Sequence, residues 1–143
     1  ALETAARRSA ILGLTWDRVD LELDVIDYRD PGARVTKKRR SVVPISRKLK
    51  PILLRAHENR STPFVLGHAG DVDKSVYRIA DKAGLEGVSP HVLRHTAATN
   101  LARNGVPLWK IAKLLGNSVV IVERVYAKHC PDDLRAAVDM ISN

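Results

Sequence analysis

The stretch SPHVLRHTAATNLARNGVPLWKIAKLLGNS, residues 89–118, decides the fold because it carries the start and stop signals of two successive helices. Ser89 followed by Pro90 is typical of a helix start, with the serine as N-cap and the proline at the first helical position. Gly105 is expected to end the first helix and Gly116 the second. The stretch therefore predicts two helices joined by a tight turn.

Helices are also expected on both sides of this stretch. Apolar spacing and capping residues predict them over residues 4–14, 47–59, about 71–83, 119–128 and 131–142. Thr4 is the expected N-cap of the first of these helices and Ser46 of the second.

A change of period marks the part of the chain that is expected to form strands. Residues 16–28 approach an alternating pattern, and residues 33–45 place β-branched residues on both sides of a KKRR run. The Asp-Pro-Gly sequence at 30–32 supplies turn chemistry. We therefore expect an α+β fold, mainly helical, with an antiparallel sheet of two to three strands near the N-terminus and a basic hairpin tip.

Composition excludes several classes of protein. The chain has 143 residues, of which 45% are hydrophobic and 28% charged, as in one globular domain. A single Cys forms no internal disulfide and falls short of a multi-Cys metal site. No apolar run approaches the length of a membrane span, and no signal peptide opens the sequence.

Charge is distributed unevenly along the chain. The formal net charge is +8, and residues 34–60 contain ten Lys or Arg residues but only one acid, Glu58. Such a block suits a polyanion, with nucleic acid as the first candidate. A solvated basic surface is the alternative.

Four residues carry candidate chemistry. His91 and Arg94 lie one turn apart at a predicted helix start, where backbone N–H groups attract anions, so they form a candidate phosphate site. Arg7 in the first helix and Tyr126 near the end are a candidate anion ligand and a candidate nucleophile. For each of these residues an ordinary surface or core position is the alternative. His57, His68 and His95 have no pattern that assigns them a role.

The order of these segments is more specific than any one of them. TAARRSAILGLTWDRVDL is followed by VTKKRRSVVPIS, by the quoted stretch and by VERVYAKH. The chain thus resembles the catalytic domain of the tyrosine recombinase (phage integrase) family from Thr4 to about Met140.

The resemblance implies a set of site residues. It assigns the family's catalytic positions to Arg7, Lys37, His91, Arg94, Asn117 and Tyr126, with Tyr126 as nucleophile. Lys38 is the rival of Lys37 for the role of general acid. Asn117 stands where many members have His or Trp, and Ala10 stands where members often carry an acid. Residues expected to bind DNA are Lys38, Arg39, Arg40, Arg47 and Lys48.

The resemblance also implies a reaction. A site-specific recombinase cleaves and rejoins double-stranded DNA through a 3′-phosphotyrosine, without a metal, a cofactor or ATP. In that reaction His91 is expected to handle the tyrosine proton. Two alternatives remain. One is a non-catalytic DNA-binding module built on the basic hairpin and the helix-turn-helix-like residues 101–115, and the other is a type IB topoisomerase-like enzyme.

Family members further imply an assembly and a setting. We expect residues 1–143 to be a catalytic domain separated from an N-terminal core-binding domain, and to act in a homo-tetramer on DNA. The segment 131–142 is expected to dock either on a neighbouring subunit or on its own domain. Accessory DNA-bending proteins are further candidate partners. A bacterial or phage-encoded protein that acts on the nucleoid is expected in the cytoplasm and not in a membrane.

Overall fold

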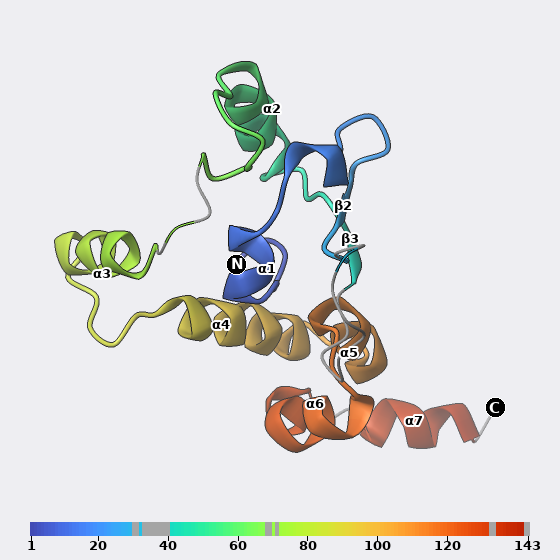
Figure 1. The fold of residues 1–143 in the computed structure, drawn as a ribbon. Helices are drawn as coiled ribbons and strands as arrows, with labels where there is room; N and C mark the ends of the chain where they lie inside the picture. The colour runs from blue at the N-terminus through green and yellow to red at the C-terminus, as the bar shows by residue number, and fades with distance from the viewer. Residues whose placement is uncertain (30–31, 33–40, 68–69, 71, 132–133, 142–143) are drawn as a thin grey trace.

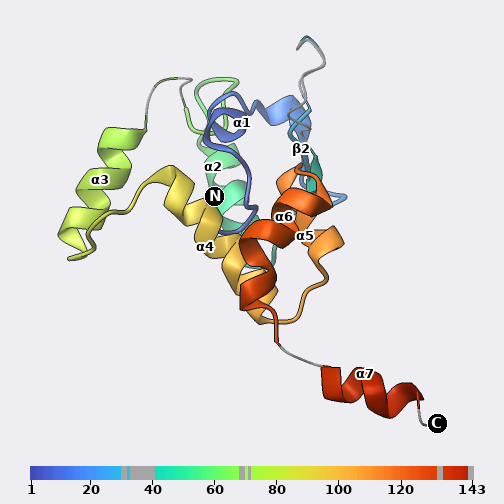
Figure 2. The same cartoon turned by 90° about the horizontal axis from the view of Figure 1, so that it is seen from below.

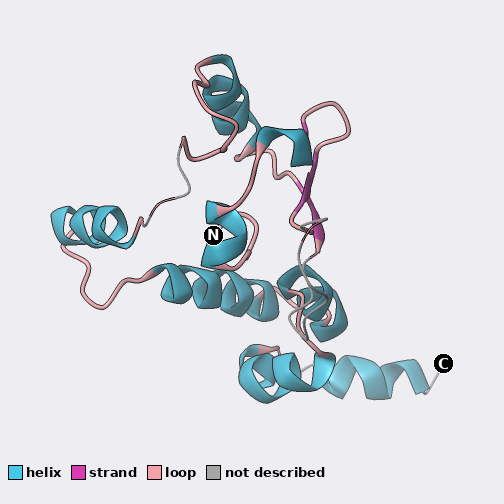
Figure 3. Cartoon of the chain, in the orientation of Figure 1, coloured by secondary structure: helices cyan, strands magenta, loops and turns pink. Residues whose placement is uncertain are grey.

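The computed structural model describes residues 1–29, 32, 41–67, 70, 72–131 and 134–141 (Figure 1). Figure 3 shows that helices dominate this part of the chain and that the strands form one small sheet. The predicted α+β class is therefore confirmed. Its elements are α1 (Arg8–Leu12), the 3-10 turn η1 (Trp16–Arg18), β1 (Val19–Asp20), β2 (Val25–Asp27), β3 (Val42–Pro44), α2 (Lys50–Glu58), α3 (Asp73–Lys82), α4 (Pro90–Arg103), α5 (Leu108–Leu115), α6 (Val119–Tyr126), the 3-10 turn η2 (Ala127–His129) and α7 (Leu134–Ile141).

The sheet is antiparallel with the strand order β1-β2-β3. Ile26 of β2 pairs with Val43 of β3, and both side chains are buried. Because side chains alternate along a strand, this register turns one face of the hairpin toward the core. Residues 33–40, which carry the predicted basic tip between β2 and β3, lie outside the described residues.

Two apolar cores meet at the N-terminal segment. The first is formed by α4, α5 and α6 and includes Ile111 and Val122, both fully buried. The second joins α1 to the sheet and α2. Ala5 belongs to the first core and Ala6 to the second, and Leu114 packs against both. The residue that follows, Arg7, is thereby fixed at the seam between the two cores.

The helix boundaries of the quoted stretch agree with the sequence signals. The Ser89 hydroxyl accepts a hydrogen bond from the backbone N–H of Val92 at 3.3 Å, and Pro90 is the first residue of α4. Gly116 ends α5 in the left-handed region at φ 60°. Ser118 then caps α6 by accepting from the N–H of Ile121 at 3.4 Å.

The predicted role of Thr4 as an N-cap is wrong. α1 starts at Arg8, with Arg7 as N-cap residue and no side-chain cap. Thr4 is buried instead, and its hydroxyl lies 3.3 Å from the hydroxyl of Tyr28. Tertiary packing against the sheet therefore outweighs the local capping preference of threonine.

Two helices lie at the periphery. Figures 1 and 2 show α3 beyond the N-terminal end of α4, and Figure 2 shows α7 apart from the body of the fold. Val138, Met140 and Ile141 of α7 are exposed, although helices usually cover such residues. None of the helices in the described part of the chain has the length and apolar character to cross a membrane.

Candidate active site

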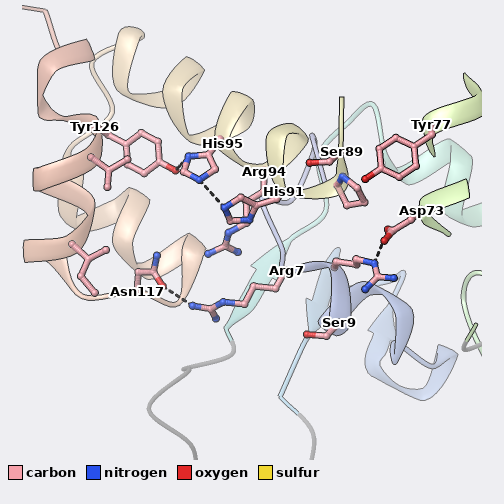
Figure 4. Close-up of a pocket in the computed structure, with 14 residues that line it drawn as sticks. Arg7, Ser9, Asp73, Tyr77, Ser89, His91, Arg94, His95, Asn117 and Tyr126 are labelled. Atoms are coloured by element: carbon pink, nitrogen blue, oxygen red, sulfur yellow. Dashed lines mark hydrogen bonds and ion pairs between the residues drawn. The ribbon is translucent and has the colours of Figure 1, made fainter. Parts of the chain in front are cut away.

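One pocket of about 630 Å³ gathers the residues that the sequence singled out. Figure 4 shows side chains from the N-terminal segment, α3, α4 and the α5–α6 region converging on it. Its lining includes Arg7, His91, Arg94, Asn117 and Tyr126. Five of the six predicted catalytic residues are thus brought together from the two ends of the chain.

Arg94 lies at the back of this pocket and is only 7% exposed. Its guanidinium donates hydrogen bonds to the backbone oxygen of Ala5 at 2.5 Å and to that of Leu115 at 2.8 Å. Ala5 has a positive φ of 50°, in the left-handed region that few non-glycine residues adopt. Arg94 therefore holds three separate parts of the chain at one point.

The C-terminal end of α5 supplies acceptors for both arginines. Arg7 donates from Nη2 to the backbone oxygen of Gly116 at 3.2 Å and to Oδ1 of Asn117 at 2.5 Å. The last carbonyl groups of a helix lack intrahelical partners and carry the negative end of its dipole. We call Arg7 and Arg94 the arginine clamp. The bend at Gly116 directs the carbonyl oxygens of Leu115 and Gly116 toward the two guanidinium groups.

Positive charge is concentrated in this part of the pocket. Burial, and next the charge of Arg7, lowers the pKa of Arg94 to about 10, while Tyr126 acts in the opposite direction. Arg94 therefore remains a cation at neutral pH. Because its partners at Ala5 and Leu115 are neutral carbonyls, they leave its charge available to an anion.

Asn117 is oriented by the clamp. Since its Oδ1 accepts from Arg7, the Nδ2 group is the donor end of this side chain. An amide donor can bind a phosphate oxygen but cannot carry a proton. The position after the LLG sequence is therefore equipped for binding and not for acid–base chemistry.

Two imidazoles and a phenol form the other part of the pocket. His91 and His95 lie on one face of α4, with their Nε2 atoms 2.9 Å apart. Nδ1 of His95 lies 2.8 Å from the hydroxyl of Tyr126. We call His91, His95 and Tyr126 the His–His–Tyr chain. Figure 4 shows its three side chains in sequence, with His95 in the middle.

Tyr126 combines a buried ring with a hydroxyl that lines the pocket. The residue is 5% exposed and belongs to the core of α4, α5 and α6. Burial raises the pKa of Tyr126, although the charge of Arg94 opposes this effect. The phenol is therefore protonated at neutral pH and needs a base before it can act as a nucleophile.

The remaining predicted residues lie elsewhere. Lys37, Lys38, Arg39 and Arg40 lie outside the described residues. Arg47 and Lys48 are exposed in the turn before α2 and do not line the pocket. Their predicted contact with DNA therefore stays a prediction.

His95 is the site residue that sequence reasoning missed. The available signal was its spacing, because a residue four positions after His91 shares the same helix face. That spacing does not reveal the contact with Tyr126, which is 31 positions away in the sequence. Among the residues that the structure describes, no group of three or more His, Cys, Asp or Glu side chains is placed so that it could hold a metal ion.

Comparisons with known proteins agree with this geometry. The sequence model of the phage integrase family matches residues 1–131. The tyrosine recombinase XerA of Thermococcus kodakarensis is 34% identical over 143 residues, covering 92% of this chain and 49% of that protein. The chain spans about half the length of the curated relatives it matches.

Solved structures share the fold. The catalytic domain of bacteriophage HP1 integrase matches with a TM-score of 0.71 at 27% identity, over 96% of this chain and 76% of that one. The Tn1549 transposon integrase, in complex with circular intermediate DNA, matches with a TM-score of 0.78 at 22% identity. That match covers 98% of this chain and 57% of the transposon integrase.

Proposed function

Since the chain belongs to the phage integrase family, we propose that residues 1–143 are the catalytic domain of a site-specific DNA recombinase. The observation that carries this proposal is the pocket itself. It brings a buried cationic clamp, two imidazoles and the hydroxyl of one tyrosine to the same place. Phosphoryl transfer to a tyrosine uses a nucleophilic hydroxyl, a group that takes its proton and cations that stabilise the charge on the phosphate, and this pocket supplies all three.

In the proposed cleavage step Tyr126 attacks a DNA phosphodiester. Its Oη–H bond breaks, a bond forms between Oη and phosphorus, and the bond from phosphorus to the 5′-oxygen breaks. The 3′-phosphate stays on the tyrosine, and the 5′-oxygen leaves as a hydroxyl after receiving a proton. When the 5′-hydroxyl of a second strand attacks the phosphotyrosine, the same changes run backwards and the DNA is rejoined without ATP.

The arginine clamp stabilises the negative charge that develops on the phosphate oxygens. Arg7 and Arg94 bind the two non-bridging oxygens, and Nδ2 of Asn117 adds a neutral donor. Fixed donors of this kind act most strongly on the transition state, where the negative charge is largest. His91, at the N-terminus of α4, adds a further donor beside the phosphate.

Protonation of the leaving oxygen is assigned to Lys37 through the family resemblance, with Lys38 as the rival. A substrate with sulfur in place of the bridging 5′-oxygen distinguishes them, because a thiolate leaves without a proton. The general acid is the lysine whose replacement by Ala slows cleavage of the oxygen substrate but not of the sulfur substrate.

DNA binding and assembly follow from the same proposal. Double-stranded DNA is the partner, held in part by the basic residues Lys38, Arg39, Arg40, Arg47 and Lys48. The complete recombinase has an N-terminal core-binding domain and acts as a homo-tetramer in the cytoplasm, with accessory DNA-bending proteins. The exposed apolar residues of α7 support docking of residues 131–142 on a neighbouring subunit.

A covalent adduct tests the proposal. The DNA is a nicked duplex whose site is selected from a random-sequence pool by binding to the Tyr126→Phe variant of the full-length protein. The nick lets the short cleaved strand diffuse away and traps the phosphotyrosine, which is measured on a denaturing gel. We expect an adduct from the wild type and from Tyr77→Phe, a control tyrosine that lines the same pocket, but none from Tyr126→Phe.

The alternatives predict other results. A DNA-binding module forms no adduct in any of the three proteins, and this outcome would overturn the proposal. A nicking-closing enzyme also forms the adduct, but it relaxes a supercoiled plasmid without exchanging strands between two target sites. Recombinant products from a plasmid that carries two copies of the selected site therefore separate a recombinase from a topoisomerase.

A further inference from the structure

The structure places His95 between the nucleophile and the histidine of the HxxR motif. Nδ1 of His95 is 2.8 Å from the hydroxyl of Tyr126, whereas its Nε2 is 2.9 Å from Nε2 of His91. Both distances are those of hydrogen bonds. In this arrangement the ring in contact with the tyrosine proton belongs to His95 and not to His91.

Two sets of tautomers satisfy both contacts of His95, and they differ in whether the phenol donates or accepts the hydrogen bond. The first set has the phenol as donor. A protonated phenol donates to Nδ1 of His95, so the neutral His95 ring carries its own hydrogen on Nε2. That hydrogen points at Nε2 of His91, which must then be the acceptor and carry its hydrogen on Nδ1. In this set the hydrogen bonds lead from the hydroxyl of Tyr126 through His95 to His91. In the reverse set His91 donates to Nε2 of His95, and Nδ1 of His95 donates to the phenol oxygen, which leaves His95 no lone pair for the tyrosine proton.

The groups around His95 favour its neutral form. On α4 it faces His91 and Arg94, and across the pocket it faces Tyr126 of α6 and the clamp residue Arg7. Burial, followed by the charges of His91 and Arg94, lowers the pKa of His95. The ring is thus unprotonated near neutral pH and has a lone pair for the tyrosine proton.

A carboxylate that lines the pocket is paired with an arginine. Asp73 of α3 lines the same pocket, but one of its oxygens lies 2.8 Å from Nε of Arg8. Among the basic side chains in the described part of the pocket, it is the imidazole of His95 that lies within hydrogen-bond distance of the tyrosine hydroxyl.

We propose that His95 is the general base that takes the proton of Tyr126 during cleavage, and that His91 receives a proton from it in turn. The proposal rests on the function proposed above. As Oη bonds to phosphorus, its proton passes to Nδ1 of His95, and the Nε2 proton of His95 passes to Nε2 of His91. His91 becomes an imidazolium beside the phosphate, where its positive charge stabilises the negative charge that develops on the phosphate oxygens. In rejoining, the protons return and the tyrosine leaves as a neutral phenol.

Single-turnover cleavage of the selected nicked duplex tests this role. General acid–base catalysis contributes roughly 100- to 10,000-fold to a rate, so His95→Gln is expected to slow adduct formation by at least about 100-fold. The glutamine keeps a hydrogen-bond acceptor near Tyr126 but cannot be protonated. His57→Gln is the matched control, since His57 packs on Trp16 outside the pocket.

A bridging 5′-sulfur substrate shows which proton is involved. Because the sulfur leaves without protonation, a defect in the leaving-group acid disappears on this substrate, whereas a defect on the tyrosine side persists. We expect the His95→Gln defect to persist and the fall of the wild-type rate toward acid pH to vanish in this variant. Cleavage by His95→Gln at the wild-type rate, or full recovery on sulfur, would overturn the role of His95. Absence of an adduct from the wild type would instead overturn the proposed function.

A second measurement needs neither DNA nor activity. Nitrogen-15 NMR of the imidazole side chains distinguishes the two neutral tautomers in the wild-type protein. We expect the Nε2–H form for His95, and a mixture of both forms in Tyr126→Phe, where the hydrogen bond to Nδ1 is lost. An Nδ1–H form of His95 in the wild type would contradict the proposal even if the His95→Gln variant does not fold.

Discussion

The arginine clamp and the His–His–Tyr chain share one pocket but are held there in different ways. Arg94 is buried and donates to backbone oxygens from two other parts of the chain. His91 is exposed and His95 half-buried, and the two rings contact each other and the tyrosine hydroxyl. The guanidinium groups of the clamp are therefore bonded into the folded backbone, whereas the imidazoles lie at the surface of the pocket.

This difference predicts that substitutions in the two groups have different effects on folding and on cleavage. A side chain that satisfies buried carbonyl groups cannot be removed without leaving those groups unpaired. A half-exposed imidazole leaves no such defect, since water replaces it. Loss of a clamp residue should therefore reduce both folding and cleavage, whereas loss of an imidazole should reduce cleavage and change folding mainly through its pH dependence.

Replacing Arg94 by Ala gives the largest combined effect. Loss of one charge-stabilising donor slows the chemical step by about 100- to 1000-fold. The carbonyl groups of Ala5 and Leu115 also lose their partner, and each buried unsatisfied group costs about 1–3 kcal/mol. Adduct formation and urea unfolding measure the two effects. Arg103→Ala, an exposed arginine on the same helix, is the control and should change neither.

Replacing Arg7 by Ala tests whether the two arginines of the clamp differ in their contribution to stability. The rate loss should again be about 100-fold or more, because Arg7 is the second cation of the clamp. The stability loss should be smaller than for Arg94, since Arg7 and one of its acceptors, Asn117, are half-buried, whereas Arg94 and both of its acceptor residues are buried. Urea unfolding of both variants measures the two losses in the free energy of unfolding. Equal losses of stability would contradict the assignment of Arg94 as the deeper anchor.

The comparison also explains what the sequence could predict. Ser89, Pro90 and Gly116 act within one turn of their own position, so their local signals are sufficient for α4 and α5. Thr4 carries an equally good local signal, yet packing near Tyr28 overrides it. The HxxR pair is visible because both residues share one helix. The role of His95 is invisible because it depends on how α6 packs against α4.

Gly116→Ala tests the link between the clamp and the end of α5. Its φ of 60° is a left-handed conformation, which costs a residue with a Cβ about 1–2 kcal/mol. We expect a stability loss of this size and a decrease in cleavage smaller than that of Arg7→Ala, since the carbonyl acceptors shift but remain. Gly13→Ala is the control because Gly13 has a φ of −88° and a Cβ there meets the Ser9 oxygen at an ordinary 3.5 Å. Equal effects of both substitutions would contradict this account.

The smallest expected effect is a pH dependence of folding that comes from the His–His–Tyr chain. The pKa of His95 is lower in the folded protein than the value of about 6.5 expected after unfolding. Between these two values the unfolded chain binds more protons, so the stability contributed by neutral His95 is present above about pH 6.5. This stability is lost as the pH falls through the pKa of His95 in the folded protein.

The free energy of unfolding of the wild type and of His95→Gln, measured at pH values on both sides of about 6.5, isolates this contribution because the glutamine does not titrate. The free energy of unfolding should fall less steeply toward acid pH in the variant. Identical slopes would mean that the pKa of His95 is the same in the folded and the unfolded protein, which would contradict the lowered pKa of the folded imidazole.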